Sequence, residues 1–206
     1  MKVINYEIEV IEDNCTGCYL CEQICPTLAI TMVGPKSAAV AVVDNSKCIA
    51  CQRCVDICDD DALLMPERAV PMTVGTDTKL ADPAAIIDLC QRAKIHPSTI
   101  ACNCSSTTAK EVAAAILLGA HTMEEVSLAT GVQSGCQLYC FAPTHRLLTT
   151  FLGEAPKPPS KNKYYNTSYV LQDIDEAVAA KYPKFHIADE RDAISARLDR
   201  LSEPRT

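Results

Sequence analysis

The sequence lacks tryptophan, and aromatic residues make up only 5% of it. A core so poor in rings must be packed from aliphatic side chains or built around something that is not protein. A long hydrophobic run is also missing, because the longest, Val112 to Leu118, is too short to cross a bilayer. The opening residues, MKVINYEIEV, contain no apolar stretch of the kind found in secretion signals. These absences predict a chain without a membrane span, located in the reducing cytoplasm.

Motifs for bound nucleotides and for covalent catalysis are absent as well. There is no Gly-rich phosphate loop and no GxGxxG motif, so we expect no bound flavin or nicotinamide nucleotide. No pair of a nucleophile and a general base is evident, so we predict no catalytic residues. Among the functional hypotheses, a self-contained enzyme therefore ranks lowest. The net charge is −7, and most of the excess acid lies in residues 1–75. This excess argues against a nucleic-acid partner, and it fits either docking on a basic protein surface or an ordinary solvated face.

Cysteine, by contrast, is abundant, with 13 in 206 residues. An odd number of cysteines in tight runs favours metal ligation over disulfide bridges. One run has the pattern C-x2-C-x2-C-x3-C-P, and its spacing recurs later in the chain, which indicates an internal repeat. The cysteines of the repeat are Cys15, Cys18, Cys21 and Cys25, then Cys48, Cys51, Cys54 and Cys58.

This pattern is typical of 4Fe-4S ligation, in which three thiolates on a tight loop hold three corners of a cubane and the fourth binds the other cluster. We therefore predict two 4Fe-4S clusters. One is expected on Cys15, Cys18, Cys21 and Cys58, and the other on Cys48, Cys51, Cys54 and Cys25. The second run continues with Asp59 where the pattern has Pro, and Asp60 and Asp61 follow. Negative charge there should lower the potential of the nearest cluster.

On these motifs, residues 1–70 resemble the two-4Fe-4S bacterial-type ferredoxins. The resemblance implies a ferredoxin-like α+β fold and one-electron transfer. Within each half we expect a cysteine loop, a short helical turn and a strand. The strands are expected at residues 4–10, 29–33, 39–43 and 62–65. Residues 66–81, which include Pro66, Pro71 and Gly75, look like a connector.

A second constellation pairs a C-x-C motif, Cys102 and Cys104, with a C-x3-C motif, Cys136 and Cys140. Four thiolates in two pairs suit two irons with two ligands each. The stretch CNCSSTTAKEVAAAILLGAHTMEEVSLATGVQSGCQLYC resembles the 2Fe-2S-binding domain of bacterioferritin-associated ferredoxin. The resemblance implies one 2Fe-2S cluster on these cysteines, in a small all-α, helix-turn-helix-like domain over residues 97–152. The second pair of that family is usually C-x2-C, so a 4Fe-4S cluster and a zinc ion remain alternatives.

Capping and stop signals predict a series of helices after the connector. Asp82 as N-cap and Pro83 at the first helical position begin the first helix. Thr108 and Thr122 each precede a glutamate by three residues, which is the pattern of a capping box. The expected helices span about residues 84–93, 108–118, 122–130, 136–151, 173–182 and 188–201.

Two further residues have a potential link to the clusters. Cys90, the thirteenth cysteine, falls on the apolar face of the first predicted helix with Ile86 and Ile87. We interpret it as a small buried hydrophobe, with a ligand role near the third cluster as the alternative. His145 is expected on a helix surface, or else to tune a cluster by hydrogen bonding.

The sequence as a whole predicts an α+β protein with a helical C-terminal tail. The expected division is a ferredoxin domain at 1–70, a connector and helix at 71–96, the cluster-binding helical domain at 97–152, and a linker and tail for partner docking at 153–206.

The leading functional hypothesis is an iron–sulfur electron-transfer subunit. It would relay single electrons through three clusters to or from a flavin- or metal-containing catalytic subunit of a larger oxidoreductase. The alternative is a free soluble ferredoxin-type carrier or a cluster-sensing regulator, and a structural zinc protein is a further one.

Overall fold

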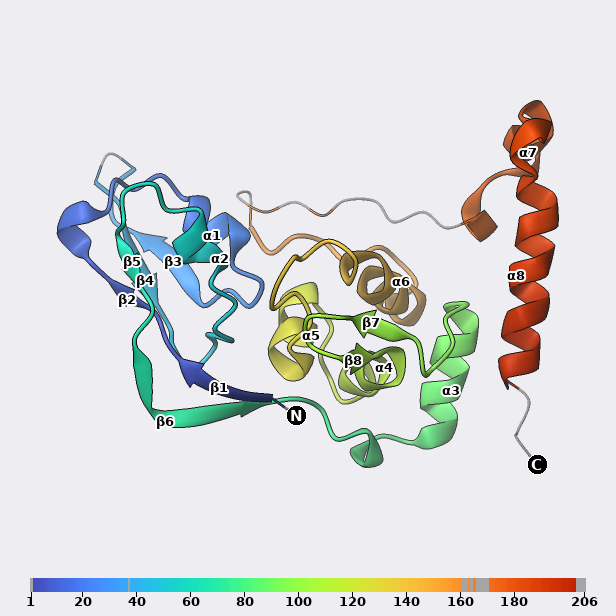
Figure 1. Ribbon diagram of the computed structural model, residues 1–206, viewed down its shortest axis with the longest axis horizontal. Coiled ribbons are helices and arrows are strands. Elements are labelled where there is room, and N and C mark those ends of the chain that lie inside the picture. The colour runs from blue at the N-terminus through green and yellow to red at the C-terminus, as the bar shows by residue number, and fades with distance from the viewer. Residues whose placement is uncertain (1, 37, 161–162, 164, 166–170, 203–206) are drawn as a thin grey trace.

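A computed structural model describes residues 2–36, 38–160, 163, 165 and 171–202 of the chain. It combines helices with small two-stranded sheets, which confirms the predicted α+β class. A strand-rich first part lies beside a helical second part, and a helical tail stands on the far side of the second part (Figure 1). We use these names for residues 2–74, 83–152 and 171–202.

Antiparallel strand pairs build the first part. The pairs are β1 (Lys2–Tyr6) with β6 (Glu67–Val74), β2 (Glu9–Val10) with β5 (Leu63–Leu64), and β3 (Ile30–Val33) with β4 (Val40–Val43). The helical elements are the 3-10 turn η1 (Glu12–Asn14), α1 (Leu20–Ile24) and α2 (Arg53–Asp56). The predicted strands are confirmed in place, although the first is split into β1 and β2.

Strand β6 occupies half of residues 66–81, the stretch that we expected to be a connector, so that prediction was wrong for residues 67–74. Its register against β1 shifts between Ile4 and Tyr6, and Pro71 lies in the irregular stretch opposite. Among the described strands β6 pairs with β1 alone, so the missing N–H of this proline is tolerated as it is in edge strands.

The second part surrounds α4, whose inward residues are completely buried. Three consecutive alanines in α4, Ala113 to Ala115, let its neighbours approach closely, and Leu89, Leu147 and Leu148 fill the space around them. The elements are η2 (Thr78–Leu80) ahead of this part, then α3 (Pro83–Arg92), β7 (Ile100–Cys102), β8 (Thr107–Thr108), α4 (Ala109–Leu117), α5 (Met123–Thr130) and α6 (Phe141–Leu152). The hairpin of β7 and β8 corrects the expectation of an all-α domain.

Two of the three predicted helix caps are formed, and the third is not. Asp82 accepts the N–H of Ala84 at 3.0 Å, as an N-cap should. Thr122 and Glu125 form both bonds of the predicted capping box. Thr108 makes no such bond, and Glu111 accepts the N–H of Thr76 at 3.3 Å instead. Tertiary contact has therefore replaced the local cap at the start of α4.

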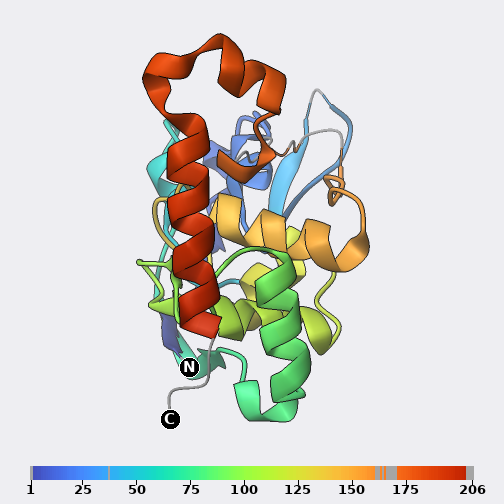
Figure 2. The ribbon, with the colours of Figure 1, turned by 90° about the vertical axis from the view of Figure 1, so that its right-hand side faces the viewer.

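The tail forms η3 (Leu171–Asp173), α7 (Glu176–Lys181), η4 (Pro183–Phe185) and α8 (Ile187–Ser202), which confirms the two predicted helices. It is fastened by Arg146 of α6, which donates to both carboxylate oxygens of Asp173 at 2.8 and 3.3 Å. Gln91 of α3 and Ser195 of α8 line one cavity, so α8 stands beside α3 (Figure 2). No helix within the described residues has the length and apolar character needed to cross a membrane.

Candidate iron–sulfur centres

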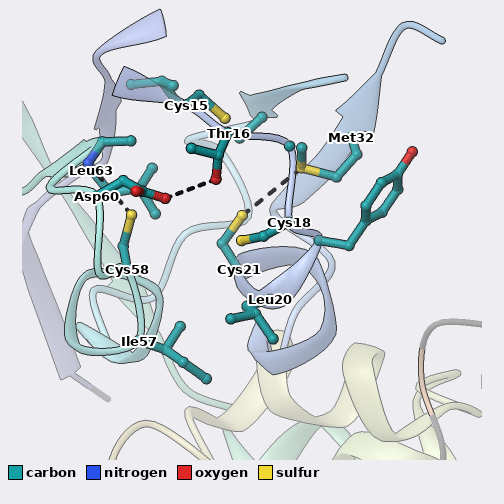
Figure 3. Close-up of a pocket in the computed structure, with 15 residues that line it drawn as sticks. Cys15, Thr16, Cys18, Leu20, Cys21, Met32, Ile57, Cys58, Asp60 and Leu63 are labelled. Carbon is teal, nitrogen blue, oxygen red and sulfur yellow. Dashed lines mark hydrogen bonds between the residues drawn. The ribbon is translucent and has the colours of Figure 1, made fainter. Parts of the chain in front are cut away.

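One cavity of the first part brings together the cysteines predicted for the first cluster. Cys15 and Cys18 come from the loop before α1, Cys21 lies in α1, and Cys58 follows α2. Figure 3 shows their sulfur atoms around a common space, with Thr16 donating to a carboxylate oxygen of Asp60 at 2.7 Å beside it. The fourth cysteine at this cavity thus comes from the other half of the repeat.

A second cavity contains the other four cysteines of the repeat. Its lining includes Cys25, Cys48, Cys51 and Cys54 together with Ile8, Ile30 and Ile49. Three of the four cysteines are buried, whereas Cys51 is partly exposed. Here too, three cysteines come from one half of the repeat and one from the other.

The internal repeat extends to the backbone around the fourth cysteine of each run. The N–H of Ala29 donates to the sulfur of Cys25 at 3.2 Å, and the N–H of Ala62 donates to the sulfur of Cys58 at 3.4 Å. The residue before each donor has left-handed backbone, with φ of 55° at Leu28. Such N–H donors stabilise negative charge on a thiolate and so prepare it for iron.

Burial disfavours ionisation of four thiols of the first part, those of Cys21, Cys48, Cys51 and Cys54. Burial raises the pKa of Cys21 and of Cys51 to about 11. Burial, followed by the neighbouring thiolates of Cys51, Cys25 and Cys48, also raises the pKa of Cys54. Four thiolates around an apolar hollow therefore need cations among them, and this donor set fits a 4Fe-4S cluster.

The third site gathers Cys102, Cys104, Cys136 and Cys140 as two crosswise pairs. The sulfurs of Cys104 and Cys136 lie 4.0 Å apart at the surface, and the buried thiols of Cys102 and Cys140 hydrogen-bond to each other. Each contact joins a cysteine of C-x-C to one of C-x3-C. Among the described residues, including this site, no three His, Cys, Asp or Glu side chains lie close enough together to bind a single metal ion.

Hydrogen bonds prepare the third site for thiolate ligands. The hydrogen bond between Cys102 and Cys140 lowers the pKa of Cys102, and Ser105 lowers it further, whereas the same bond raises the pKa of Cys140. The backbone N–H groups of Leu138 and Tyr139 lower the pKa of Cys136. These hydrogen bonds stabilise negative charge on Cys102 and Cys136, and this suits thiolates that ligate the irons of a cluster.

Two residues that the sequence did not single out as functional shape the third site. A Cβ at Gly135 would lie 2.6 Å from the sulfur of Cys104, so only glycine fits there. Lys2 reaches across from β1, donates to the hydroxyl of Ser134 at 3.2 Å, and lines a cavity with Cys104. The loop position of Gly135 was readable from the sequence, whereas nothing in the sequence placed Lys2 here.

The remaining cysteine lies in the core of the second part. Cys90 is fully buried in α3 beside Leu89, and burial raises its pKa to about 11. Ile86 is buried with it, but Ile87 is 46% exposed. The prediction of a buried hydrophobe is confirmed.

His145 is buried, so the prediction of a surface position was wrong. Its ring stacks on Phe141 with centroids 5.3 Å apart, and burial lowers its pKa.

Comparison with protein families identifies both cluster-binding parts. A family model described as a 4Fe-4S dicluster domain matches residues 14–63, and one described as a BFD-like [2Fe-2S] binding domain matches residues 100–150. Neither a curated protein nor a solved structure matches the chain significantly. The chain thus contains both kinds of domain and binds two 4Fe-4S clusters and one 2Fe-2S cluster. These are domains of electron transfer, and both predicted resemblances are confirmed.

Proposed function

We propose that the chain is an electron-transfer subunit of a larger oxidoreductase, which relays single electrons to or from a flavin- or metal-containing catalytic subunit in the cytoplasm. One observation carries this proposal. Cys18 is exposed at the first cavity, and Cys104 and Cys136 are exposed at the third site, whereas Cys25 and Cys48 of the second cavity are buried. Electrons could therefore enter at one of these two exposed sites and leave at the other, which suits a relay between two partners.

The proposal includes the predicted ligands and domains. Cys15, Cys18, Cys21 and Cys58 would hold one 4Fe-4S cluster, Cys25, Cys48, Cys51 and Cys54 the other, and Cys102, Cys104, Cys136 and Cys140 the 2Fe-2S cluster. The cysteine groups of the three sites support this assignment. Each cluster, when bound, accepts and releases one electron. The protein ligates the irons, excludes water from the second cavity and donates backbone N–H groups to sulfur.

We assign a ferredoxin-like arrangement to residues 1–70 and separate cluster binding to residues 97–152, with a connector and helix at 71–96. The internal repeat supports the first assignment. Residues 153–206 would serve partner docking, and the helices of the tail carry no buried residue among their described side chains.

An apolar surface pair next to the third site supports a bound partner. Leu138 and Tyr139 lie between Cys136 and Cys140, with 68% and 73% of their surfaces exposed. Aromatic and large apolar side chains are enriched at the centres of protein interfaces. A partner seated on this pair would lie directly against the exposed ligand Cys136.

Anaerobic purification of the tagged chain from its native source tests the proposal. We expect a stoichiometric partner that carries a flavin or metal centre. The double variant Leu138→Ser/Tyr139→Ser should lose this partner and keep about ten irons per chain, the sum for the three clusters. Val70→Ser, which changes an exposed apolar residue on β6, should keep both. A wild-type chain that purifies alone as a monomer would contradict the subunit role.

That outcome would favour a free carrier, which one observation also supports. The exposed acids Asp59, Asp60 and Asp61 lie beside Cys58 of the first cavity and offer negative charge for brief docking on a basic protein.

A further inference from the structure

The first and second parts meet at a hydrogen bond next to two proposed iron ligands. The side-chain amide of Gln137 donates to the backbone carbonyl of Ile24 at 3.1 Å. Gln137 directly follows Cys136 of the third site, and Ile24 directly precedes Cys25 of the second cavity. The two residues that form this bond are therefore the direct chain neighbours of Cys136 and Cys25.

Gln137 is set apart from its neighbours in the cysteine loop. Its φ of 55° lies in the left-handed region, which is uncommon for glutamine and persists only where the surroundings fix it. Leu138 and Tyr139 point into solvent, whereas Gln137 is partly buried against the first part. Of the three residues inside C-x3-C, this one reaches the other cysteine loop.

The carbonyl of Cys25, the residue after Ile24, also accepts a hydrogen bond from outside the first part. Lys163, from the segment that leads to the tail, donates its ammonium to the carbonyl of Cys25 and lies 3.3 Å from a carboxylate oxygen of Glu124 in α5. Tyr165 donates to the other oxygen of Glu124 at 2.5 Å. The Lys163 and Glu124 side chains are only 7% and 5% exposed, so each charge depends on the other.

Apolar packing also joins the second cavity to the second part. Leu128 of α5 packs on the small cluster formed by Ile4, Ile49 and Val74, next to Cys51. The cysteine loop of the first cavity has a different setting, because Thr16 bonds to Asp60 within the first part and Cys18 faces solvent.

We propose that Gln137, together with Lys163 and Glu124, positions the Cys25 loop against the Cys136 loop and so sets the place where electrons cross between the two parts. The order of sites is then the Cys15 cavity, the Cys25 cavity and the Cys102 site. In the crossing, one electron leaves one cluster and enters the other, so that one is oxidised as the other is reduced and no proton moves. The proposal rests on the ligand assignment of the proposed function.

The test compares two variants that add the same charge next to the same segment. Gln137→Glu removes the donor and sets a carboxylate against the Ile24 carbonyl, whereas Gln23→Glu changes an exposed residue of α1 beside Ile24. The first readout is the broadening of the 2Fe-2S electron paramagnetic resonance signal by the reduced cluster of the second cavity. The second is the rate of electron equilibration between clusters after flash reduction.

We expect Gln137→Glu to lose the broadening and the fast phase of equilibration, and Gln23→Glu to keep both. Gln137→Lys, which restores an N–H donor, should recover part of each. Gln137→Glu with unchanged spectra and rates would overturn the proposal.

Iron and sulfide counts distinguish a refutation of the crossing point from a refutation of the proposed ligand assignment. A wild-type chain with fewer than about ten irons would refute the ligand assignment, whereas full iron with no effect of Gln137→Glu refutes only the crossing point. If Gln137→Glu assembles without its third cluster, the neutral pair Glu124→Gln/Lys163→Met tests the other contact that holds the Cys25 loop, the bond from Lys163 to the carbonyl of Cys25. It should weaken the broadening, and an unchanged signal would overturn the proposal.

Discussion

Asp60 illustrates how one side chain can change the reduction potential of an iron–sulfur cluster. Its carboxylate lines the first cavity and is held there by the hydroxyl of Thr16. A fixed negative charge disfavours the reduced, more negative form of a cluster. We expect Asp60→Asn to raise the potential of the cluster in this cavity by on the order of tens of millivolts. Protein-film voltammetry measures the shift, with Glu67→Gln on exposed β6 as the control. An unchanged potential would refute the role.

Arg68 is a half-buried counterpart that contacts the backbone of Cys48, a residue of the second cavity. Its guanidinium donates to the carbonyls of Tyr6 at 2.8 Å, Asn45 at 2.5 Å and Cys48 at 3.0 Å. We expect Arg68→Met to destabilise the chain by about 2–4 kcal/mol, because it leaves several carbonyls without a donor.

The same variant should lower the potential of the cluster in the second cavity, because a positive charge near Cys48 is removed. Urea unfolding and voltammetry measure the two effects. Arg92→Met serves as the matched control, because Arg92 pairs with Asp88 at the surface. Equal losses of stability in both variants would contradict the role of Arg68.

Gly135 has the sharpest steric requirement at the third site. We expect Gly135→Ala to push against the sulfur of Cys104 and to lose the 2Fe-2S cluster, so that the iron count falls by about two per chain. Ser134→Ala, one residue earlier, should retain the full count. A Gly135→Ala protein with a normal 2Fe-2S spectrum would show that the loop can yield.

At the scale of the elements, α4 and α5 begin with the same sequence signal and differ in structure. Thr122→Ala removes a formed capping box and should cost about 1 kcal/mol of unfolding free energy. Thr108→Ala should cost clearly less, since Thr108 caps nothing. Chemical unfolding of the two cluster-loaded variants measures the difference, and similar losses would contradict it.

The elements also show which features of the fold can be predicted from the sequence and which cannot. Three cysteines of each cavity were predictable because their spacing on a short loop brings their sulfurs together, and the fourth was predictable from the internal repeat. Helix α5 was predictable because its cap is local. Strand β6 was missed because its pairing with β1 comes from distant sequence. The contacts of Lys2 and Gln137 were out of reach for the same reason, since each joins the first part to the second.

At the scale of the whole molecule, the two cluster-binding parts differ in what fills them. The first part has cysteines among its main core residues, including Cys21, Cys25, Cys48 and Cys54. The second part has an aliphatic core of its own around α4. Clusters should therefore contribute most of the folding free energy of the first part and less of the second.

Removal of the clusters by chelation tests this difference. We expect hydrogen exchange to show loss of protection in β1 to β6 and retained protection in α3 and α4. Circular dichroism should show that part of the helical signal survives. An iron-free chain with its full secondary structure would contradict the expectation, and so would uniform collapse of both parts.

The exposed sulfurs of Cys18, Cys104 and Cys136 have one more consequence. Surface thiolates are what peroxide and oxygen reach first. Oxidative damage should therefore begin at the Cys15 cavity and at the Cys102 site, and should reach the Cys25 cavity, where three of the four cysteines are buried, last.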